Sequence, residues 1–408
     1  MKKMEGYFYY FTIFYLLNYL WIERYFPIIK KLSLVNCLIL FLFLKLIINT
    51  PNLLVKKRAK IDIFIIALFL IVIIIGIFSG WVYTYQPLNS ILIDLFLFSR
   101  FFILYISIQF FVSDSLKKNL AQFFLANLKV LVFVNFIFLL INIPTHVFPT
   151  LDVRFGFPSQ QLLYPHPTYL GTIAFLGWDL ITDSQDKYYK GMAFLLMLST
   201  MRTKLILIAV AYILYNFFNY QMKIPISQKV IGVASSLSII YYFFSDTIYN
   251  KMLSQESSAR FLIMSTAVKI AKDHFPFGSG FASYGSNTSF TYYSPIYVLY
   301  GLSRTYGFLT NSYQYGTDSY ISMVLAQFGF FGCLLYIAMF ALIIFNMLND
   351  AADIKARKSM ELLAFYLILS FFTESIISSG TGIAILGFIS LNTHTSRQKS
   401  HMLNNDFD

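Results

Sequence analysis

Three arginines, Arg154, Arg202 and Arg260, are the residues of this 408-residue sequence whose type and surroundings best suit chemistry. They lie at the edges of apolar runs or between them, and Arg260 is near the start of an expected helix. A guanidinium group stays charged and binds phosphate oxygens through paired hydrogen bonds, and a helix N-terminus adds affinity for anions. Arginines that converge at a membrane face would therefore suit a lipid pyrophosphate. The alternative is that each one reaches lipid headgroups or pairs with an acid.

A few other polar residues complete the candidate site. Asp318 begins an expected helix, where it either caps the helix or acts as a general base toward a sugar hydroxyl. Glu374, near the end of another expected helix, is a candidate to orient an arginine, and His166 is isolated, with no spacing typical of a metal site. Arg100 lies inside an apolar run, where it either contributes to substrate binding or pairs with an acid. Lys204, one turn from the outer face, is expected to reach lipid headgroups.

The polar segment 257–281 carries Arg260 and ends in a proline- and glycine-rich turn that contains Gly278 and Gly280. Apolar residues repeat at helical spacing between Arg260 and this turn, which predicts an amphipathic helix that ends near residue 276. Such a helix either lies along the membrane surface or presents Arg260 to a ligand.

The composition predicts the elements that position these residues. The chain is 58% hydrophobic and only 12% charged, and apolar runs of transmembrane length recur along it. We therefore expect an all-α, polytopic integral membrane protein that forms a single transmembrane domain over residues 1–408, with about twelve transmembrane helices. The expected segments are 7–22, 32–49, 61–83, 88–112, 121–143, 169–182, 191–201, 203–220, 230–244, 318–348, 360–378 and 381–393. The pair 191–201 and 203–220 forms either two half-helices around Arg202 or one broken helix.

The basic residues predict the orientation of the chain. Most clusters of lysine and arginine fall on one side of the expected helices, which makes that side, and both termini, cytoplasmic. Arg24, Lys30 and Lys31 disagree, because they fall on the opposite side. Two extracytoplasmic loops follow, at about 144–168 and 245–317. The excess of basic residues in such a chain indicates contact with anionic lipid or an anionic substrate and not with nucleic acid.

The second loop is rich in tyrosine, a residue that suits both sugar rings and the membrane interface, and for most of these residues the interface is the favoured interpretation. The tyrosines are Tyr284, Tyr292, Tyr293, Tyr297, Tyr300, Tyr306, Tyr313 and Tyr315.

Four motifs in order resemble those of the O-antigen ligase and Wzy polymerase superfamily, over roughly residues 150 to 390. The early loop with Arg154, Gly156, His166 and Pro167 resembles the family's R-x-x-G…H/N-P loop, and Ser199 to Arg202 resembles its Ser-x-Ser-Arg segment. Arg260 with Pro276 to Gly280 resembles its R…P-x-G-x-G signature, and Asp318-Ser319-Tyr320 with Gly329 to Gly332 resembles the helix that follows its large loop.

This resemblance implies an all-helical glycosyltransferase of the bacterial cytoplasmic membrane that uses undecaprenyl-pyrophosphate-linked glycans at its outer face. Arg154, Arg202 and Arg260 would hold the pyrophosphate without a metal or other cofactor, and Arg100, His166, Gly278, Gly280, Tyr320 and Glu374 would contribute to substrate binding. The implied partners are the donor and acceptor glycans, membrane lipids and a chain-length regulator.

The start of the helix after the large loop separates the two activities of the superfamily. Ligases typically carry a histidine there, whereas this chain carries Asp318. The expected function is therefore a polymerase that joins repeat units of O-antigen, capsule or exopolysaccharide, with Asp318 as the base. The alternatives are a ligase that transfers finished glycan to lipid A core or another acceptor, and a flippase or other transporter. A transporter predicts repeat symmetry, which the sequence does not show.

Overall fold

The computed structural model describes residues 2–55, 60–154, 156–181, 186–220, 259–310, 315–349, 354–374, 377 and 379–392. Helices dominate this part of the chain, and each expected apolar segment within it forms one. The segment 230–244, Tyr313 and the beginning of the second loop lie outside the described residues. The helices are α1 (Lys2–Tyr25), α2 (Pro27–Leu32), α3 (Leu34–Val55), α4 (Lys60–Tyr83), α5 (Leu88–Phe111), α6 (Asp114–Thr145), α7 (Pro167–Leu180), α8 (Lys187–Ser199), α9 (Thr203–Tyr220), α11 (Ala259–Asp273), α12 (Asn287–Thr291), α13 (Pro295–Leu299), α14 (Tyr320–Asn349), α15 (Ile354–Thr373) and α16 (Gly380–Asn392).

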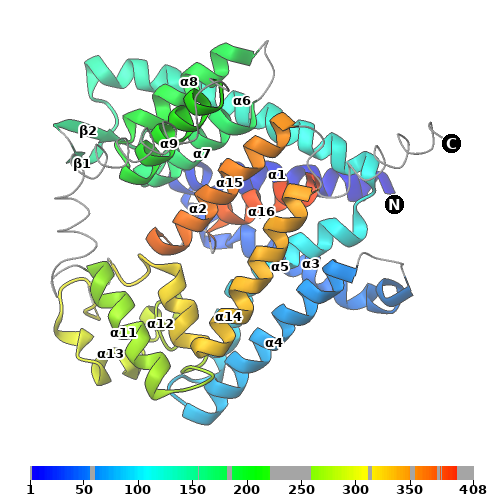
Figure 1. The fold of residues 1–408 in the computed structure, drawn as a ribbon, viewed down its shortest axis with the longest axis vertical. Coiled ribbons are helices and arrows are strands. Elements are labelled where there is room, and N and C mark those ends of the chain that lie inside the picture. Colours follow the sequence, from blue (N-terminus) through cyan, green and yellow to red (C-terminus); the bar gives the residue numbers. More distant parts are fainter. Residues whose placement is uncertain are drawn as a thin grey trace.

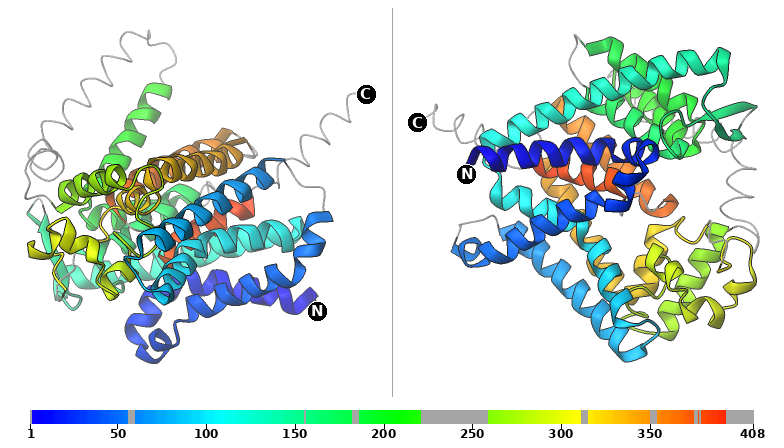
Figure 2. Two further views of the ribbon diagram at one scale, coloured as in Figure 1. Left: turned by 90° about the horizontal axis from the view of Figure 1, so that it is seen from below. Right: turned by 180° about the vertical axis from the view of Figure 1, so that it is seen from behind.

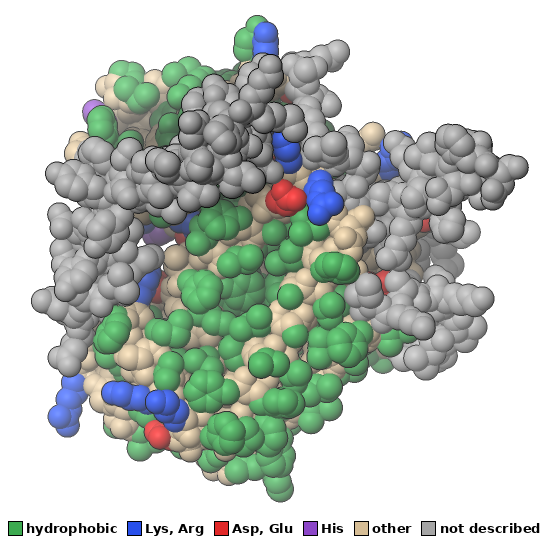
Figure 3. Space-filling view, in the orientation of Figure 1, with side chains coloured by type: hydrophobic (Ala, Val, Ile, Leu, Met, Phe, Trp, Pro, Cys, Tyr) green, Lys and Arg blue, Asp and Glu red, His purple; other side chains and the backbone are tan. Residues whose placement is uncertain are grey.

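Five stretches of the described helices are long and apolar enough to cross a membrane: Pro27–Asn49, Asp62–Tyr83, Leu88–Phe111, Asp114–Thr145 and Tyr320–Asn349. Many of their large apolar side chains are exposed, including Ile48, Ile74 and Leu334. On the face shown in Figure 3, hydrophobic side chains cover the middle and lower part, and the few charged side chains border this area above and at the lower left. These features are consistent with an all-α membrane protein, while the expected number of about twelve spans stays a prediction.

The long helices pack around α5, which contacts α3, α4, α12 and α16. The start of α1, the end of α3 and the start of α6 gather at one end of the molecule, on the right of Figure 1. The segment after α6 and the unit of α11, α12 and α13 lie at the opposite end, and Figure 2 shows the same separation from behind. The two expected loops therefore share one end of the helix assembly.

A β-hairpin departs from the expected all-α architecture. Strands β1 (Thr150–Arg154) and β2 (Phe157–Gln160) pair antiparallel in the first expected loop, with Arg154 opposite Phe157. Strands this short carry too little alternation of apolar and polar residues to be predicted from a single sequence. The hairpin fixes the backbone on which Arg154 stands.

Helix α11 confirms the helix expected between Arg260 and the glycine-rich turn. Its apolar face, with Ile263, Ala267 and Ile270, is fully buried, and the helix packs against α14. Protein and not lipid therefore covers this face, which disfavours the alternative of a helix that inserts its apolar face into the membrane surface.

Tyr284 and Tyr297 contribute to the same small core and are almost completely buried. The Tyr284 hydroxyl donates to the Ile263 carbonyl at 2.9 Å. For these two tyrosines both expected roles, at the membrane interface and against a sugar ring, are wrong.

Candidate functional site

The site lies where the two expected loops approach the helices, and Arg202 stands at its centre. Arg202 Nη2 is 3.7 Å from Asp152 Oδ1, and Arg154 Nε donates to Asp152 Oδ2 at 2.7 Å. Burial and the neighbouring charge of Arg154 lower the pKa of Arg202 to about 10, and Arg260 acts in the same direction. The structure therefore brings together the three arginines that the sequence singled out, from the hairpin, from the α8–α9 junction and from the start of α11.

A break between two helices places Arg202. Helix α8 ends at Ser199 and α9 begins at Thr203, which confirms the expected interruption at this arginine. Met201 adopts a left-handed backbone conformation within the break, and the Ser159 hydroxyl donates to the Thr200 carbonyl at 2.7 Å. That bond ties the break to β2, so the loop that carries Arg154 and the junction that carries Arg202 form one structural unit.

Arg154, Arg202 and Arg260 form the arginine cluster, and some of its described hydrogen-bond donors have no partner. Among the described residues, Arg202 Nε, Arg202 Nη2 and Arg260 Nε are buried without a hydrogen-bond partner. Buried donors normally have partners, and charged donors left without one carry a large desolvation cost. An anion bound between Arg202 and Arg260 would satisfy these donors and offset the repulsion between the guanidinium groups.

Asp318 lies in the same electrostatic environment. Burial raises the pKa of its carboxyl to about 6, with Arg260 lowering it and Glu374 raising it further. Helix α14 begins at Tyr320, so Ser319, which accepts a hydrogen bond from the Ser322 hydroxyl, occupies the position before the first helical residue. The capping alternative for Asp318 is therefore disfavoured. A carboxylate with a pKa near 6 suits a general base at neutral pH.

His166 caps α7, and its Nδ1 accepts a hydrogen bond from the Thr168 amide at 3.2 Å. Burial and the charge of Arg202 lower the pKa of the imidazole to about 4, so the ring is neutral at physiological pH. Because Nδ1 accepts, the proton of the neutral ring lies on Nε2. His166 thus retains one neutral donor, Nε2–H, and interacts electrostatically with Arg202 and Arg154.

Glu374 was expected to orient an arginine, but it pairs with a lysine. Its Oε2 lies 3.0 Å from Lys204 Nζ, which also donates to the Ser370 hydroxyl at 2.9 Å. Lys204 lies over the ring of Tyr366 at 4.3 Å, and only 8% of its side chain is exposed. The expectation that Lys204 reaches lipid headgroups is therefore wrong. The sequence signal for this pair was an acid and a base at the same membrane depth on different expected helices.

Comparison with protein families identifies the segment that holds most of this cluster. Residues 191–337 match the family model described as O-antigen ligase. The match confirms the resemblance to the O-antigen ligase and polymerase superfamily, and it points to a membrane ligase or polymerase acting on polysaccharide. No curated protein matches the chain. The matched segment contains Arg202, Arg260 and Asp318, while Arg154 and His166 precede it.

Arg100 and Tyr320 have partners outside the group of Arg154, Arg202 and Arg260. Arg100 Nη1 donates to Asn36 Oδ1 at 3.0 Å, and its side chain lines an open cavity of about 350 Å³. The Tyr320 hydroxyl is buried at 2.7 Å from the Tyr336 hydroxyl. Both residues border a second, smaller cavity of about 40 Å³ that also reaches Thr317, next to Asp318.

Gly278 and Gly280 occupy the family's glycine-rich turn, but the packing favours a structural role over the expected substrate contact. Both have positive φ angles, and a Cβ atom at either one would overlap the backbone of α14 or α4. The Ser279 amide donates to the Ala326 carbonyl and the Gly280 amide to the Gln327 carbonyl, each at 2.9 Å. The turn is thus bonded directly to the backbone of α14, which departs from helical geometry at Gly329.

Three residues that sequence reasoning missed also hold the site. Asp94, inside α5, accepts from the Ala282 amide at 2.6 Å and from Gln327 Nε2 at 3.1 Å. A carboxylate inside an apolar run was the signal that could have identified Asp94.

Arg24 and Asp152 are the other two. Arg24 donates to the Leu162 carbonyl at 3.2 Å and to the Tyr164 carbonyl. Asp152 joins two arginines as described above. The contacts of Arg24 place it beside the first loop. They explain why Arg24 lies on the side opposite to most of the basic residues.

Proposed function

We propose that this chain is a polymerase that joins undecaprenyl-pyrophosphate-linked oligosaccharide repeat units at the outer face of the bacterial cytoplasmic membrane. The observation that carries the proposal is the convergence of Arg154, Arg202 and Arg260 beside a half-buried acid, Asp318, whose pKa is about 6. The two loops that supply Arg154 and Arg260, the α8–α9 junction that supplies Arg202 and the start of α14 beside Asp318 lie on the extracytoplasmic side in this proposal, and both termini are cytoplasmic.

The arginines bind the pyrophosphate of the donor and stabilise it as it leaves. The growing glycan is linked through its anomeric carbon to the pyrophosphate, and the reaction breaks this carbon–oxygen bond. The leaving pyrophosphate gains negative charge, which guanidinium groups in a site of low dielectric stabilise more strongly than water does. The unsatisfied donors of Arg202 and Arg260 face such an anion in this assignment. His166 adds a neutral donor from Nε2 without adding repulsion to the cluster.

Asp318 accepts the proton of the acceptor hydroxyl. A hydroxyl at the non-reducing end of a new lipid-linked repeat unit attacks the anomeric carbon and forms the new glycosidic bond. Its proton passes to the Asp318 carboxylate, and the electron pair of the broken bond leaves with the pyrophosphate. Arg260 interacts electrostatically with both Arg202 and Asp318, which links the donor and acceptor halves of the site.

Asp318 also favours a polymerase over a ligase, because the superfamily's ligases typically have a histidine at this place. The ligase reaction onto lipid A core or another acceptor is the second candidate, since the matched family model carries that description. The donor half of the site would be the same for both reactions. They differ only in the molecule that presents the attacking hydroxyl.

A charge-removing variant tests the donor role. We expect Arg260→Gln to leave the protein in the membrane and to abolish long chains, so that cells display single repeat units at most. Arg304→Gln is the matched control, because Arg304 is an exposed arginine of the same loop outside the cluster. A normal chain-length distribution in the Arg260→Gln strain would refute the role of Arg260.

Purified protein separates the two reactions. A polymerase reconstituted with lipid-linked repeat units alone produces a ladder of longer lipid-linked chains, whereas a ligase consumes donor only when its separate acceptor is supplied. In cells, deletion of a polymerase leaves single units attached to the surface acceptor, and deletion of a ligase leaves polymer on the lipid carrier. A ladder formed without a second acceptor supports the polymerase.

A further inference from the structure

The open cavity of about 350 Å³ beside Arg100 has the size of a small-molecule site. It is lined from α1, α2, α3, α5, α7, α12 and α16, so it lies among elements far apart in the sequence. The lining residues that matter most are Glu23, Lys30, Asn36, Arg100, Tyr169 and Asn287. Two cations, one acid, two side-chain amides and aromatic walls give it a net single positive charge and many hydrogen-bonding groups.

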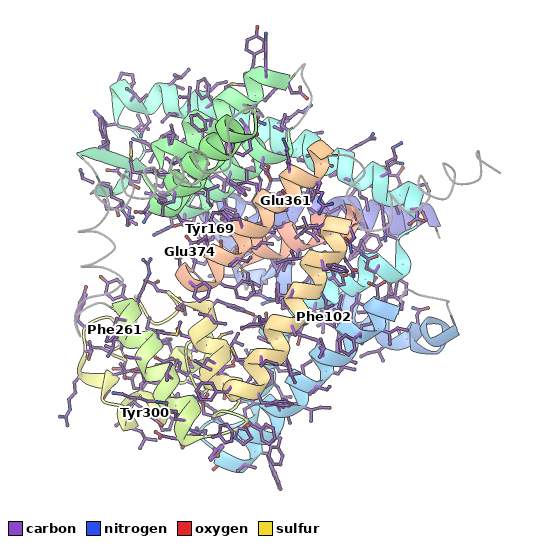
Figure 4. All side chains as sticks on the ribbon, viewed as in Figure 1. Phe102, Tyr169, Phe261, Tyr300, Glu361 and Glu374 are labelled. Atoms are coloured by element: carbon purple, nitrogen blue, oxygen red, sulfur yellow. The ribbon has the colours of Figure 1, made fainter. Side chains whose placement is uncertain are left out.

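This cavity adjoins the proposed catalytic residues at two points, one near His166 and one near Asp318. Tyr169 lies near His166, with 6.4 Å between their ring centroids, and it interacts electrostatically with Glu374. Figure 4 shows Tyr169 and Glu374 near the middle of the molecule, between the upper helices and the unit of α11 and α12. In addition, Arg100 and Asn287 line both this cavity and the smaller one that reaches Thr317, next to Asp318.

The chemistry of the lining points to a sugar with an acidic group. Amide and tyrosine side chains suit the hydroxyl groups and faces of a pyranose ring. Arg100 Nε donates to the Leu97 carbonyl at 3.3 Å and Nη1 to Asn36 Oδ1. These two protein acceptors fix the guanidinium in the cavity wall, where its charge attracts a carboxylate, and Lys30 adds a point charge. Since Glu23 offsets one of these two charges, the cavity balances a singly charged carboxylate better than a doubly charged phosphate.

We propose that this cavity binds a carboxylate-bearing sugar of the acceptor glycan and places its neighbouring hydroxyl at Asp318. The inference rests on the proposed function for the identity of the acceptor, while the preference for an acidic sugar stands on the cavity itself. The repeat unit that this protein polymerises then carries a uronic acid or a similarly carboxylated sugar near its non-reducing end.

Binding of simple probes to the full-length protein in lipid nanodiscs tests this site. Ligand-observed NMR titrations would compare the methyl glycoside of glucuronic acid with that of glucose, and with glycerol phosphate as a mimic of a lipid headgroup. We expect the glucuronide to bind most tightly and Lys30→Gln to weaken it about three-fold, as for an exposed ion pair. Lys31→Gln is the matched control, because Lys31 is an exposed lysine of the same helix that does not line the cavity.

A second variant tests the charge of Arg100 without removing its partner. Asn36→Asp keeps the oxygen that accepts from Arg100 but adds a negative charge, so it should remove the preference for glucuronide over glucoside. Equal binding of the two glycosides to the wild-type protein would overturn the proposal. So would tighter, Lys30-dependent binding of glycerol phosphate, which would make the cavity a lipid headgroup site.

The two proposals fail separately. If Arg260→Gln retains polymerisation while Lys30-dependent glucuronide binding persists, the proposed donor site fails and the acidic-sugar cavity stands. If polymerisation depends on Arg260 but glucuronide binding does not depend on Lys30, the cavity proposal fails alone. In the polymerisation assay, Lys30→Gln should raise KM for the acceptor and leave kcat unchanged.

Discussion

The role of Asp318 makes a specific prediction about pH. A general base must be deprotonated to act, and burial with the nearby charge of Glu374 raises the pKa of this carboxyl to about 6. Catalysis should therefore be weak below this pKa and rise to a plateau above it. At about pH 5 roughly a tenth of the molecules carry the carboxylate, and at about pH 7 roughly nine tenths do, so kcat/KM should increase about ten-fold between them.

Bound substrate should shift this profile in a known direction. The pyrophosphate brings negative charge close to Arg260, whose charge otherwise lowers the pKa of Asp318. The midpoint of the kcat profile, which reports the substrate complex, should then lie at higher pH than the midpoint for kcat/KM, which reports the free enzyme. In the free enzyme, His166 does not contribute to the kcat/KM profile, because its pKa of about 4 lies below this range.

The assay uses the protein in proteoliposomes with lipid-linked repeat units isolated from cells, and it measures initial rates of chain extension between about pH 5 and pH 8. Asp318→Asn keeps the shape of the side chain and removes the base, so it should lower kcat by about 100-fold or more and flatten the profile. An unchanged ten-fold rise in Asp318→Asn would show that another group titrates. A flat wild-type profile would refute a base with a pKa near 6.

Three further predictions concern the support of the site. Gly280→Ala combines a left-handed backbone with overlap against the backbone of Gly80 on α4, and we expect it to lower the free energy of unfolding by about 2–5 kcal/mol, measured as the loss of thermal stability in detergent. Lys204→Met leaves the half-buried Glu374, whose side chain is 20% exposed, without its ion-pair partner and should cost about 1–3 kcal/mol. The double variant with Glu374→Gln should recover most of that loss, and equal stability of the two variants would contradict the pairing. Asp152→Asn removes the carboxylate that competes for two arginines, so lipid pyrophosphate should inhibit this variant more strongly than the wild type, and weaker inhibition would mean that Asp152 orients the arginines instead.

The sequence predicted the helices well because apolar periodicity and length are local signals. Within the described residues, every expected apolar segment forms a helix, and the break at Arg202 lies where polar residues interrupt an apolar run. The hairpin that carries Arg154 was not predicted, because its strands depend on pairing with each other and not on their own composition. The same reason explains the error at Tyr284, whose burial depends on α11 folding against it.

Residue types and a common side of the membrane were enough to select the arginines, Asp318 and Glu374 for one site. Their exact pairings were not predictable, because a side chain's partner depends on the packing of helices that are distant in sequence. Glu374 therefore pairs with Lys204 and not with an arginine. Gly278 and Gly280 were assigned to substrate binding because they match the family's R…P-x-G-x-G signature. The backbone that approaches them belongs instead to α14 and α4.

These backbone contacts explain how a long loop can hold Arg260 accurately enough for the catalytic role that we propose. Catalytic groups must be held within fractions of an ångström, which loops achieve only when rigid elements brace them. Here α14 departs from regular helical geometry at Gly329. Its Ala326 and Gln327 carbonyls accept hydrogen bonds from backbone amides of the turn that follows α11. Asp94 on α5 then fixes the next residues through the Ala282 amide. The segment that follows α11 is thereby bonded to two long apolar helices, so the position of Arg260 at the other end of α11 depends on the packing of α14 and α5.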